Sequence, residues 1–355
     1  MFTDSVKSNR ENILYNSMSK TYLDGSKQII SATKRVFIQS GWEGRKVDRT
    51  KTNPAVARLW EKLRIQAALE EASLAPGSMG MQLADMSTFW DDLASMPEEW
   101  LTEEQKQVLI KQRMKSVHRA MRRARVKVRD YALSTDMKYF VTLTLDKEKI
   151  NRYDIHEITK ALTVWLDNQV RRRGLCYVMV PELHADGAVH FHALFNGALE
   201  VVDSGTIIPL GEDKPRKPRS EWQRADWLRR GGRIVYNLPS WPYGFTTALQ
   251  LDGCYERAVN YVCKYISKGL NTDTGDIPVK VGGRWYYSGG KLGRPEVELF
   301  NANMEDLEAG FGNAARRIVA HDLVGVDMIV VWINPDGVPR EQPRTFKEVC
   351  NGKRI

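Results

Sequence analysis

The sequence predicts an α+β fold built on a central antiparallel sheet, and three observations support this prediction. Segments that alternate apolar and polar residues, as half-buried strands do, cluster in the middle of the 355-residue chain. Two of these segments are separated by a short Ala-Asp-Gly stretch that is typical of a hairpin turn. Segments with helical periodicity lie before, between and after them, so helices are expected to flank the sheet.

The N-terminal part of the chain predicts helices. Its first 50 residues are polar and irregular, whereas residues 54–73 carry apolar side chains at the spacing of an amphipathic helix. A Thr-x-x-Gln capping box that begins at Thr102 predicts the start of a long helix over about 103–133. We therefore expect residues 1–103 to form a mainly helical N-terminal region.

The central part predicts the sheet. In chain order we expect a strand at 138–146, a helix at 156–174, two hairpin strands at 176–184 and 188–196, and a helix at 254–269. These elements define a domain over 104–300 with a Pro-, Gly- and Trp-rich insertion at about 200–250, followed by a C-terminal extension over 301–355.

The charge of the chain points to a polyanionic partner. The net charge is +9 at pH 7, and residues 105–129 hold ten Lys or Arg and no acidic residue. A second basic stretch, residues 214–233, holds eight Lys or Arg against two acidic residues. Solvated helix faces and loops are the alternative explanation. From the first stretch, the residues that we expect to bind DNA are Arg119, Arg122, Arg123 and Arg125.

Other classes of protein are disfavoured by composition. No run of about 18 apolar residues predicts a membrane span, and the first residues lack the apolar segment of a signal peptide. The four cysteines contain no Cys-x-x-Cys pair, which argues against a disulfide framework and favours a reducing compartment.

A metal site is predicted at the hairpin. His190 and His192 are two residues apart on a strand, so both imidazoles face one side, and Glu182 is the candidate carboxylate. A two-residue turn would pair Glu182 with the residue between the histidines, on the wrong face. A three-residue turn ending at Gly187 pairs it with His190 and brings the three donors to one face. His184 lies on the same face, as a further ligand or as a substrate contact. A purely structural role for the histidines is the alternative.

The helix at 254–269 carries a repeated Tyr-x-x-Lys pattern. Tyr261 and Tyr265 are four residues apart and share a helix face, with Lys264 and Lys268 each three residues later. The lysines suit a phenolate or phosphate charge. Alternatively, the tyrosines form part of an apolar stripe on the sheet, and the lysines are solvated.

Three stretches in this order, FVTLTLD, ELHADGAVHFH and YVCKYISKG, resemble the three motifs of the HUH endonuclease superfamily. The chain resembles the two-tyrosine rolling-circle replication initiators of that superfamily, such as the phage gene A and gene II replication proteins. The resemblance covers about residues 115–300 and leaves the first 100 residues unexplained.

The resemblance implies an HUH endonuclease fold and site-specific nicking and joining of single-stranded DNA at a phage or plasmid replication origin. The implied nucleophiles are Tyr261 and Tyr265, which would form a 5′-phosphotyrosine, and the implied ligands of Mg²⁺ or Mn²⁺ are Glu182, His190 and His192. Implied partners are single-stranded origin DNA and a host helicase and DNA polymerase, in the cytoplasm of a bacterial host cell.

Other functions remain open at this stage. A two-tyrosine transposase shares this chemistry, and a relaxase is disfavoured because its tyrosine precedes the histidines. A non-catalytic nucleic-acid-binding protein would explain the basic stretches and the ten tryptophans. It gives no role to the tandem tyrosines.

Overall fold

The structure is a computed structural model, and it describes residues 13–39, 103–184, 186–251, 255–266, 268, 280–319 and 326–340. The helix expected at 54–73 lies outside these residues. The chain divides into two compact units. Of the described residues, the larger unit contains 22–24 and those within 110–295, and the smaller unit contains 13–21, 25–39, 103–109 and those within 296–340.

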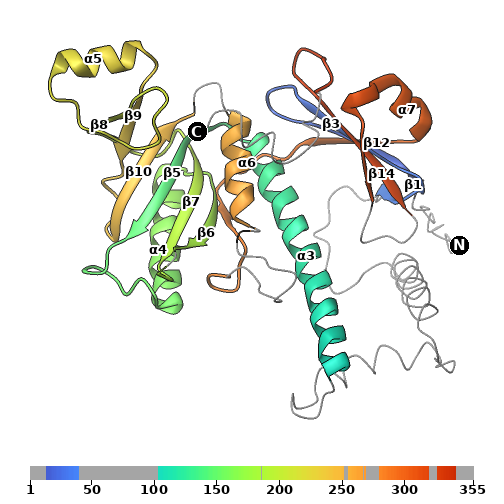
Figure 1. Cartoon of the computed structure of the whole chain (residues 1–355), viewed down its shortest axis with the longest axis horizontal. Coiled ribbons are helices and arrows are strands. Elements are labelled where there is room, and N and C mark those ends of the chain that lie inside the picture. Colours follow the sequence, from blue (N-terminus) through green and yellow to red (C-terminus); the bar gives the residue numbers. More distant parts are fainter. Residues whose placement is uncertain are drawn as a thin grey trace, which may run out of the picture. The chain divides into compact units, whose positions relative to one another are not determined.

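The larger unit contains a seven-stranded sheet in the order β11-β6-β7-β5-β10-β9-β8, in which all neighbouring strands are antiparallel (Figure 1). The α+β class with an antiparallel sheet is therefore confirmed. The strands are β5 (Met137–Leu145), β6 (Tyr177–Leu183), β7 (Val189–Asn196), β8 (Val202–Ile208), β9 (Arg233–Asn237), β10 (Gly244–Gln250) and β11 (Tyr287–Gly289).

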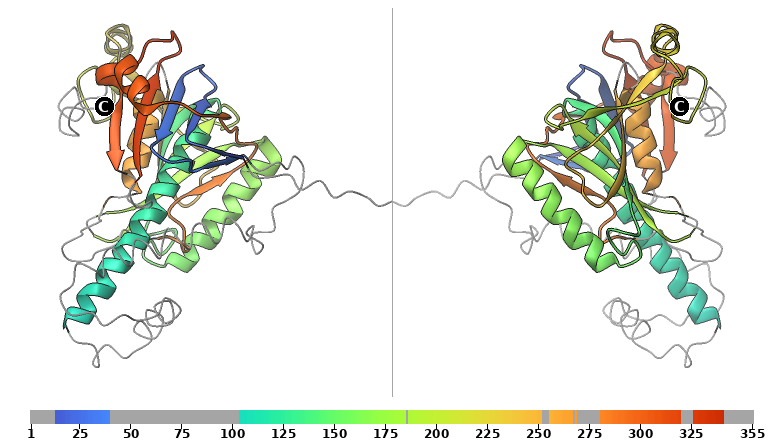
Figure 2. Two further views of the ribbon diagram at one scale, coloured as in Figure 1. Left: turned by 90° about the vertical axis from the view of Figure 1, so that its right-hand side faces the viewer. Right: turned by 90° about the vertical axis from the view of Figure 1, so that its left-hand side faces the viewer.

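Helices cover both faces of this sheet. One face carries α4 (Ile155–Arg173), and the other carries α6 (Tyr255–Tyr265), with α3 (Glu103–Leu133) beside it (Figures 1 and 2). A fourth helix, α5 (Glu221–Arg229), follows β8. No helix in the described part of the chain is long and apolar enough to cross a membrane.

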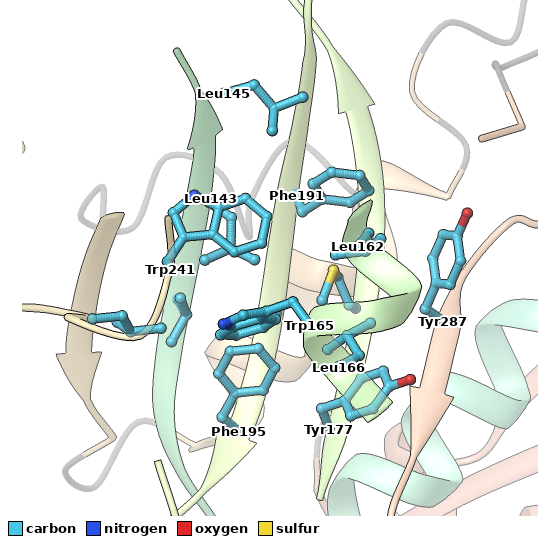
Figure 3. Packing of buried hydrophobic residues seen from close by; sticks show 14 of the residues in the cluster. Leu143, Leu145, Leu162, Trp165, Leu166, Tyr177, Phe191, Phe195, Trp241 and Tyr287 are labelled. Carbon is cyan, nitrogen blue, oxygen red and sulfur yellow. The ribbon is translucent and has the colours of Figure 1, made fainter. Parts of the chain in front are cut away.

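The hydrophobic core lies between the sheet and α4 (Figure 3). Phe191 and Phe195 of β7 are fully buried there, together with Leu143 of β5. Trp165 of α4 lies against Phe195 and donates its indole N–H to the carbonyl of Ser240 at 2.7 Å. Burying each such side chain stabilises the fold by about 1.5–3 kcal/mol. Because strand residues alternate between faces, the residues flanking Phe191 in sequence point to the opposite side, towards α6.

Local sequence explains where α4 begins and ends. The carboxylate of Asp154 accepts hydrogen bonds from the backbone N–H groups of His156 and Glu157, which caps the first turn. Gly174, at φ 72°, ends the helix in the left-handed conformation, and three arginines occupy the last turn. The observed bounds differ by one residue from the predicted helix at 156–174.

The predicted insertion at about 200–250 builds almost half of the sheet. Its strands β8, β9 and β10 extend the sheet beyond β5, and all seven residues of β10 pair with β5. The Pro-, Gly- and Trp-rich sequence did not predict these strands, because stretches such as VDSGTII of β8 do not alternate regularly between apolar and polar residues.

The smaller unit is formed by strands from both ends of the described chain. Its five-stranded sheet has the order β12-β2-β3-β14-β13, and β1 pairs with β4 in a separate two-stranded sheet. The elements are β1 (Ile13–Tyr15), β2 (Ser17–Thr21), β3 (Lys27–Ala32), β4 (Phe37–Gln39), β12 (Glu296–Phe300), α7 (Met304–Phe311), the 3-10 helix η2 (Gly312–Ala314), β13 (Arg316–Val319) and β14 (Asp327–Ile333).

The mainly helical character expected for residues 1–103 is wrong for residues 13–39, which form four strands. The pairing of β3 with β14 explains the difference, since a strand whose partner lies almost a whole chain length away is selected by that partner. The strand β12 lies in the predicted nuclease domain over 104–300, and β13 and β14 lie in the predicted C-terminal extension over 301–355. All three form one sheet with β2 and β3 of the N-terminal segment.

Candidate active site

The β6–β7 hairpin brings the predicted donors to one face of the sheet. Glu182 pairs directly with His190 across the two strands, and His192 follows two residues later on the same face. The backbone N–H of Gly187 donates to the carbonyl of His184 at 2.9 Å, and Gly187 adopts φ 84°. This is the register of the three-residue turn, so the sequence-based condition for a shared face is met.

Two threonines of β5 hold the histidine rings. Thr142 and Thr144 pair with His192 and His190 across the strands, and their hydroxyls lie 3.2 Å and 3.4 Å from the corresponding Nδ1 atoms. The Nε2 atom is therefore the ring nitrogen left for a further contact. These threonines were not predicted from the sequence. Their alternation in TLTL would have indicated them once β5 was placed beside β7.

Glu182 makes the central polar contact of the site. Its Oε2 lies 2.5 Å from Nε2 of His192, and its Oε1 forms an ion pair with Lys268. Burial alone would raise the pKa of Glu182. The hydrogen bonds from His192 and Lys268, together with their charges, instead lower that pKa to about 2. The carboxylate is therefore ionised at neutral pH although its side chain is only 12% exposed.

His190 is held in its neutral form. Burial lowers its pKa to about 4, and nearby His184 and His192 contribute in the same direction. The ring centroids of His184 and His190 are only 3.4 Å apart. His184 therefore belongs to this cluster, and a neutral imidazole at His190 can act as an electron-pair donor.

The two tyrosines of α6 lie directly over these side chains. The ring of Tyr265 stacks on His192, with 4.2 Å between centroids and an interplanar angle of 15°. The hydroxyl of Tyr265 donates a hydrogen bond to that of Tyr261 at 2.6 Å. Both rings are half-buried, whereas Val262 and Cys263 of the same helix are fully covered. The tyrosines are therefore next to the predicted metal donors and partly accessible.

The surroundings of Tyr265 favour its protonated form. Burial raises the pKa of its phenol, and the hydrogen bond with Tyr261 and the negative charge of Glu182 raise it further. At neutral pH Tyr265 is thus a hydrogen-bond donor, which leaves the oxygen of Tyr261 as the acceptor of the pair.

The two lysines of the repeated pattern have different environments. Lys268 lies over the ring of Tyr265, with 5.4 Å from Nζ to the centroid, in addition to its ion pair with Glu182. Lys264 is exposed to solvent on α6. Lys268 is therefore the lysine that the structure places within the cluster.

Two imidazoles and a carboxylate on one face are chemically suitable donors for a divalent cation, and the threonines would orient the rings for it. Within the described residues, however, no three His, Cys, Asp or Glu side chains converge in the arrangement of a metal site. Glu182 instead contacts His192 and Lys268 directly. The donor set fits a divalent metal by its chemistry, and the assignment of ligands is a proposal.

The arginines predicted to bind DNA lie on α3, which packs against α6. The Sγ atom of Cys263 lies 3.7 Å from the backbone carbonyl of Arg125, whose side chain is half-buried and whose pKa is lowered mainly by burial. Arg122 and Arg123 are exposed, and Arg119 is intermediate. Arg122 and Arg123 are thus the most accessible of the four.

A family comparison covers this site. Residues 138–270 match the family of the replication-associated protein ORF2/gene II protein. The matched range includes the hairpin, all of β5 except Met137, and both tyrosines, but less than half of the chain. The match supports a role as a replication initiator. Neither the curated proteins nor the solved structures contain a match to this chain.

Proposed function

We propose that this protein initiates rolling-circle replication of a phage or plasmid by nicking and rejoining single-stranded origin DNA through a tyrosine. One observation carries the proposal: the hydroxyls of Tyr261 and Tyr265 meet at 2.6 Å beside the Glu182–His192 pair. A purely structural tyrosine stripe would have no need to place two hydroxyls beside an ionised carboxylate and two imidazoles.

In the proposed reaction, the phenolic oxygen of one tyrosine attacks the phosphorus of a phosphodiester. A bond forms between that oxygen and phosphorus, and the bond from phosphorus to the 3′ oxygen breaks. The phenol loses its proton to water, and the 3′ oxygen takes up a proton to become a free 3′-OH. The reaction replaces the phosphodiester bond to the 3′ oxygen by a phosphodiester bond to tyrosine. The energy of the bond is therefore kept in the 5′-phosphotyrosine, and rejoining requires no ATP.

The other residues of the site would bind the metal, orient its ligands and stabilise negative charge. Glu182, His190 and His192 would hold Mg²⁺ or Mn²⁺, which when bound supplies a Lewis acid for the scissile phosphate. Thr142 and Thr144 orient the rings of His192 and His190. Lys268, beside Tyr265, contributes a positive charge near the phosphate or phenolate.

The second tyrosine is needed to terminate replication. While one tyrosine carries a strand end, the other cuts the regenerated origin, and the released 3′-OH attacks the first linkage to close a circle. A host helicase and DNA polymerase in the bacterial cytoplasm would unwind the template and extend the 3′-OH.

A covalent-capture experiment tests this proposal. The protein is incubated with a library of random-sequence single-stranded oligonucleotides and Mn²⁺, separated on a denaturing gel, and adducts are mapped by mass spectrometry. We expect adducts on Tyr261 or Tyr265 that share a short DNA sequence, and none with the double variant Tyr261→Phe/Tyr265→Phe. Tight binding without any adduct would instead identify a non-catalytic nucleic-acid-binding protein.

A further inference from the structure

A second basic surface lies far along the sheet from the tyrosines. Residues 202–237, here called the insertion module, contain β8, α5 and β9. Figure 1 shows α5 above β8 and β9, away from α4 and α6. The proposed nicking chemistry uses none of these residues, so their composition requires a separate explanation.

The insertion module is an ordered scaffold. Arg224 of α5 forms an ion pair with Asp203 of β8, which attaches the helix to the strand. The backbones of Ile207 and Arg216 exchange two hydrogen bonds at 2.9 Å and 2.8 Å, which fold the loop after β8 back onto that strand. The backbone of this loop and the start of α5 are therefore fixed to β8.

Positive charge is in excess on this scaffold. The insertion module contains eight Lys or Arg against five acidic residues, and the acids Asp203 and Glu212 pair with Arg224 and Arg216. Asp226 pairs with both Arg229 and Arg230, at 2.7 Å and 2.9 Å, so one acid compensates only one of two arginines. Three exposed residues of the loop form no ion pair within the described part of the chain: Lys214, Lys217 and Arg219.

Trp222, in the first turn of α5, is 75% exposed, and α5 has no fully buried side chain. Aromatic side chains bury about 150–250 Å² when they are packed, so an exposed tryptophan forgoes a large stabilisation. An exposed tryptophan that lies close in sequence to exposed lysines and arginines has the composition of the stacking platforms that bind unpaired bases.

We propose that the insertion module binds single-stranded DNA outside the segment that is nicked. A base stacks on Trp222, and phosphates contact Lys214, Lys217 and Arg219. Stacking selects a single strand, because the bases of a duplex present no free face. The inference rests on the proposed function only in taking DNA as the polyanion, and binding at the module does not require the tyrosines.

Binding measurements on the full chain test the inference. Fluorescence anisotropy with fluorescein-labelled (dT)30, without divalent metal, gives the Kd of each variant. We expect Trp222→Ala to raise the Kd on the order of 10- to 100-fold, as loss of one base stack does. Trp222→Tyr keeps an aromatic face and should stay within about threefold of the wild type.

Charge variants give an independent readout. Lys217→Ala/Arg219→Ala should reduce the slope of log Kd against log salt by about 1.4, because each phosphate contact to a single strand contributes about 0.7. The matched control is Arg171→Ala/Arg172→Ala, which removes two exposed arginines from the last turn of α4. This control should leave the slope unchanged.

The outcomes separate this inference from the proposed function. A Kd for Trp222→Ala within twofold of the wild type overturns the module as a DNA site, even if the wild type forms tyrosine adducts. A duplex that binds as tightly as (dT)30 and depends equally on Trp222 overturns the single-strand assignment. Conversely, if the protein binds (dT)30 through Trp222 but forms no tyrosine adduct, the proposed nicking activity is refuted and single-strand binding by the insertion module is supported.

Discussion

The hydroxyl of Tyr265 donates a hydrogen bond to the hydroxyl of Tyr261 across a distance of 2.6 Å. Only one oxygen of such a pair can be the donor, so the two tyrosines are chemically unequal before any substrate arrives. The raised pKa of Tyr265 keeps its phenol protonated, so its proton is held in this hydrogen bond and the oxygen of Tyr261 is the acceptor. We therefore expect Tyr261 to make the first cut.

The tyrosine variants test this order. Each single Tyr→Phe variant should still form one adduct on the remaining tyrosine, because phenylalanine preserves the ring packing. Tyr261→Phe should slow the first cleavage more than Tyr265→Phe, and both should fail to close circles. Single-turnover rates from denaturing gels give the measurement. Complete circle closure by Tyr265→Phe would show a one-tyrosine enzyme in which Tyr265 is only a packing residue.

The threonines of β5 provide a test of the metal assignment. Thr142→Val removes the hydroxyl that orients His192 and keeps the shape of the side chain, so Mn²⁺ affinity should fall by about 10- to 100-fold. Calorimetric titration with Mn²⁺ measures this loss. The control is Thr247→Val, at an exposed position of β10, which should bind Mn²⁺ as the wild type does. Metal-dependent cleavage that survives in His190→Ala/His192→Ala would disprove the ligand assignment.

Lys268 should have opposite effects on stability and on metal binding. Lys268→Met removes the ion pair of a largely buried carboxylate, so the metal-free protein should melt at a lower temperature. The same change removes a positive charge beside the proposed site, so Mn²⁺ should bind several-fold more tightly. Lys264→Met, at an exposed position on α6, is the control. Weaker Mn²⁺ binding in Lys268→Met would contradict the proposed position of the cation.

The arginines of α3 should separate into two groups. Arg122→Ala/Arg123→Ala removes two exposed charges and should lower the salt slope of single-strand binding by about 1.4 with little change in melting temperature. Arg125→Ala should mainly destabilise the protein, because this side chain is half-buried where α3 packs on α6. Equal salt slopes in the double variant and the wild type would mean that this face of α3 does not contact DNA.

Alkaline pH should destabilise the larger unit through Tyr177. Burial raises the pKa of this core tyrosine to about 12, above the value of about 10 in an unfolded chain. The folded state then holds the proton more tightly, so the stability contribution is complete below about pH 10 and is lost as pH rises towards 12. The loss from this group is about 1.4 kcal/mol per pH unit. Denaturant midpoints between pH 9 and pH 12 should fall less steeply for Tyr177→Phe.

Local signals were sufficient to predict part of this protein. The helix predicted over about 103–133 has the observed bounds of α3, and the pairing of Glu182 with His190 is the one that a three-residue turn ending at Gly187 predicts, of the two turns that the sequence left open. Such features depend on residues that are close together in sequence, so the sequence alone contains the information that determines them.

Contacts between distant segments were not predictable in the same way. The hydrogen bonds of Thr142 and Thr144 depend on β5 lying beside β7, and the ion pair of Lys268 with Glu182 depends on where α6 packs. The strands β2 and β3 were missed because their partners β12 and β14 lie near the other end of the chain. For such elements the tertiary partner, and not local propensity, selects the conformation.

The pairing of β3 with β14 also determines when the smaller unit can fold during synthesis. Ala32 is opposite Met328, so β3 emerges from the ribosome long before its partner exists. At about 5–20 residues per second, roughly 15 to 60 s separate the two strands. The residues of the larger unit's sheet are all translated within that interval, so that sheet can form first. The strands β2 and β3 can pair with each other early, but their outer edges must wait for β12 and β14. A ribosome that stalls before β14 releases a chain in which one edge of β3 is open to aggregation.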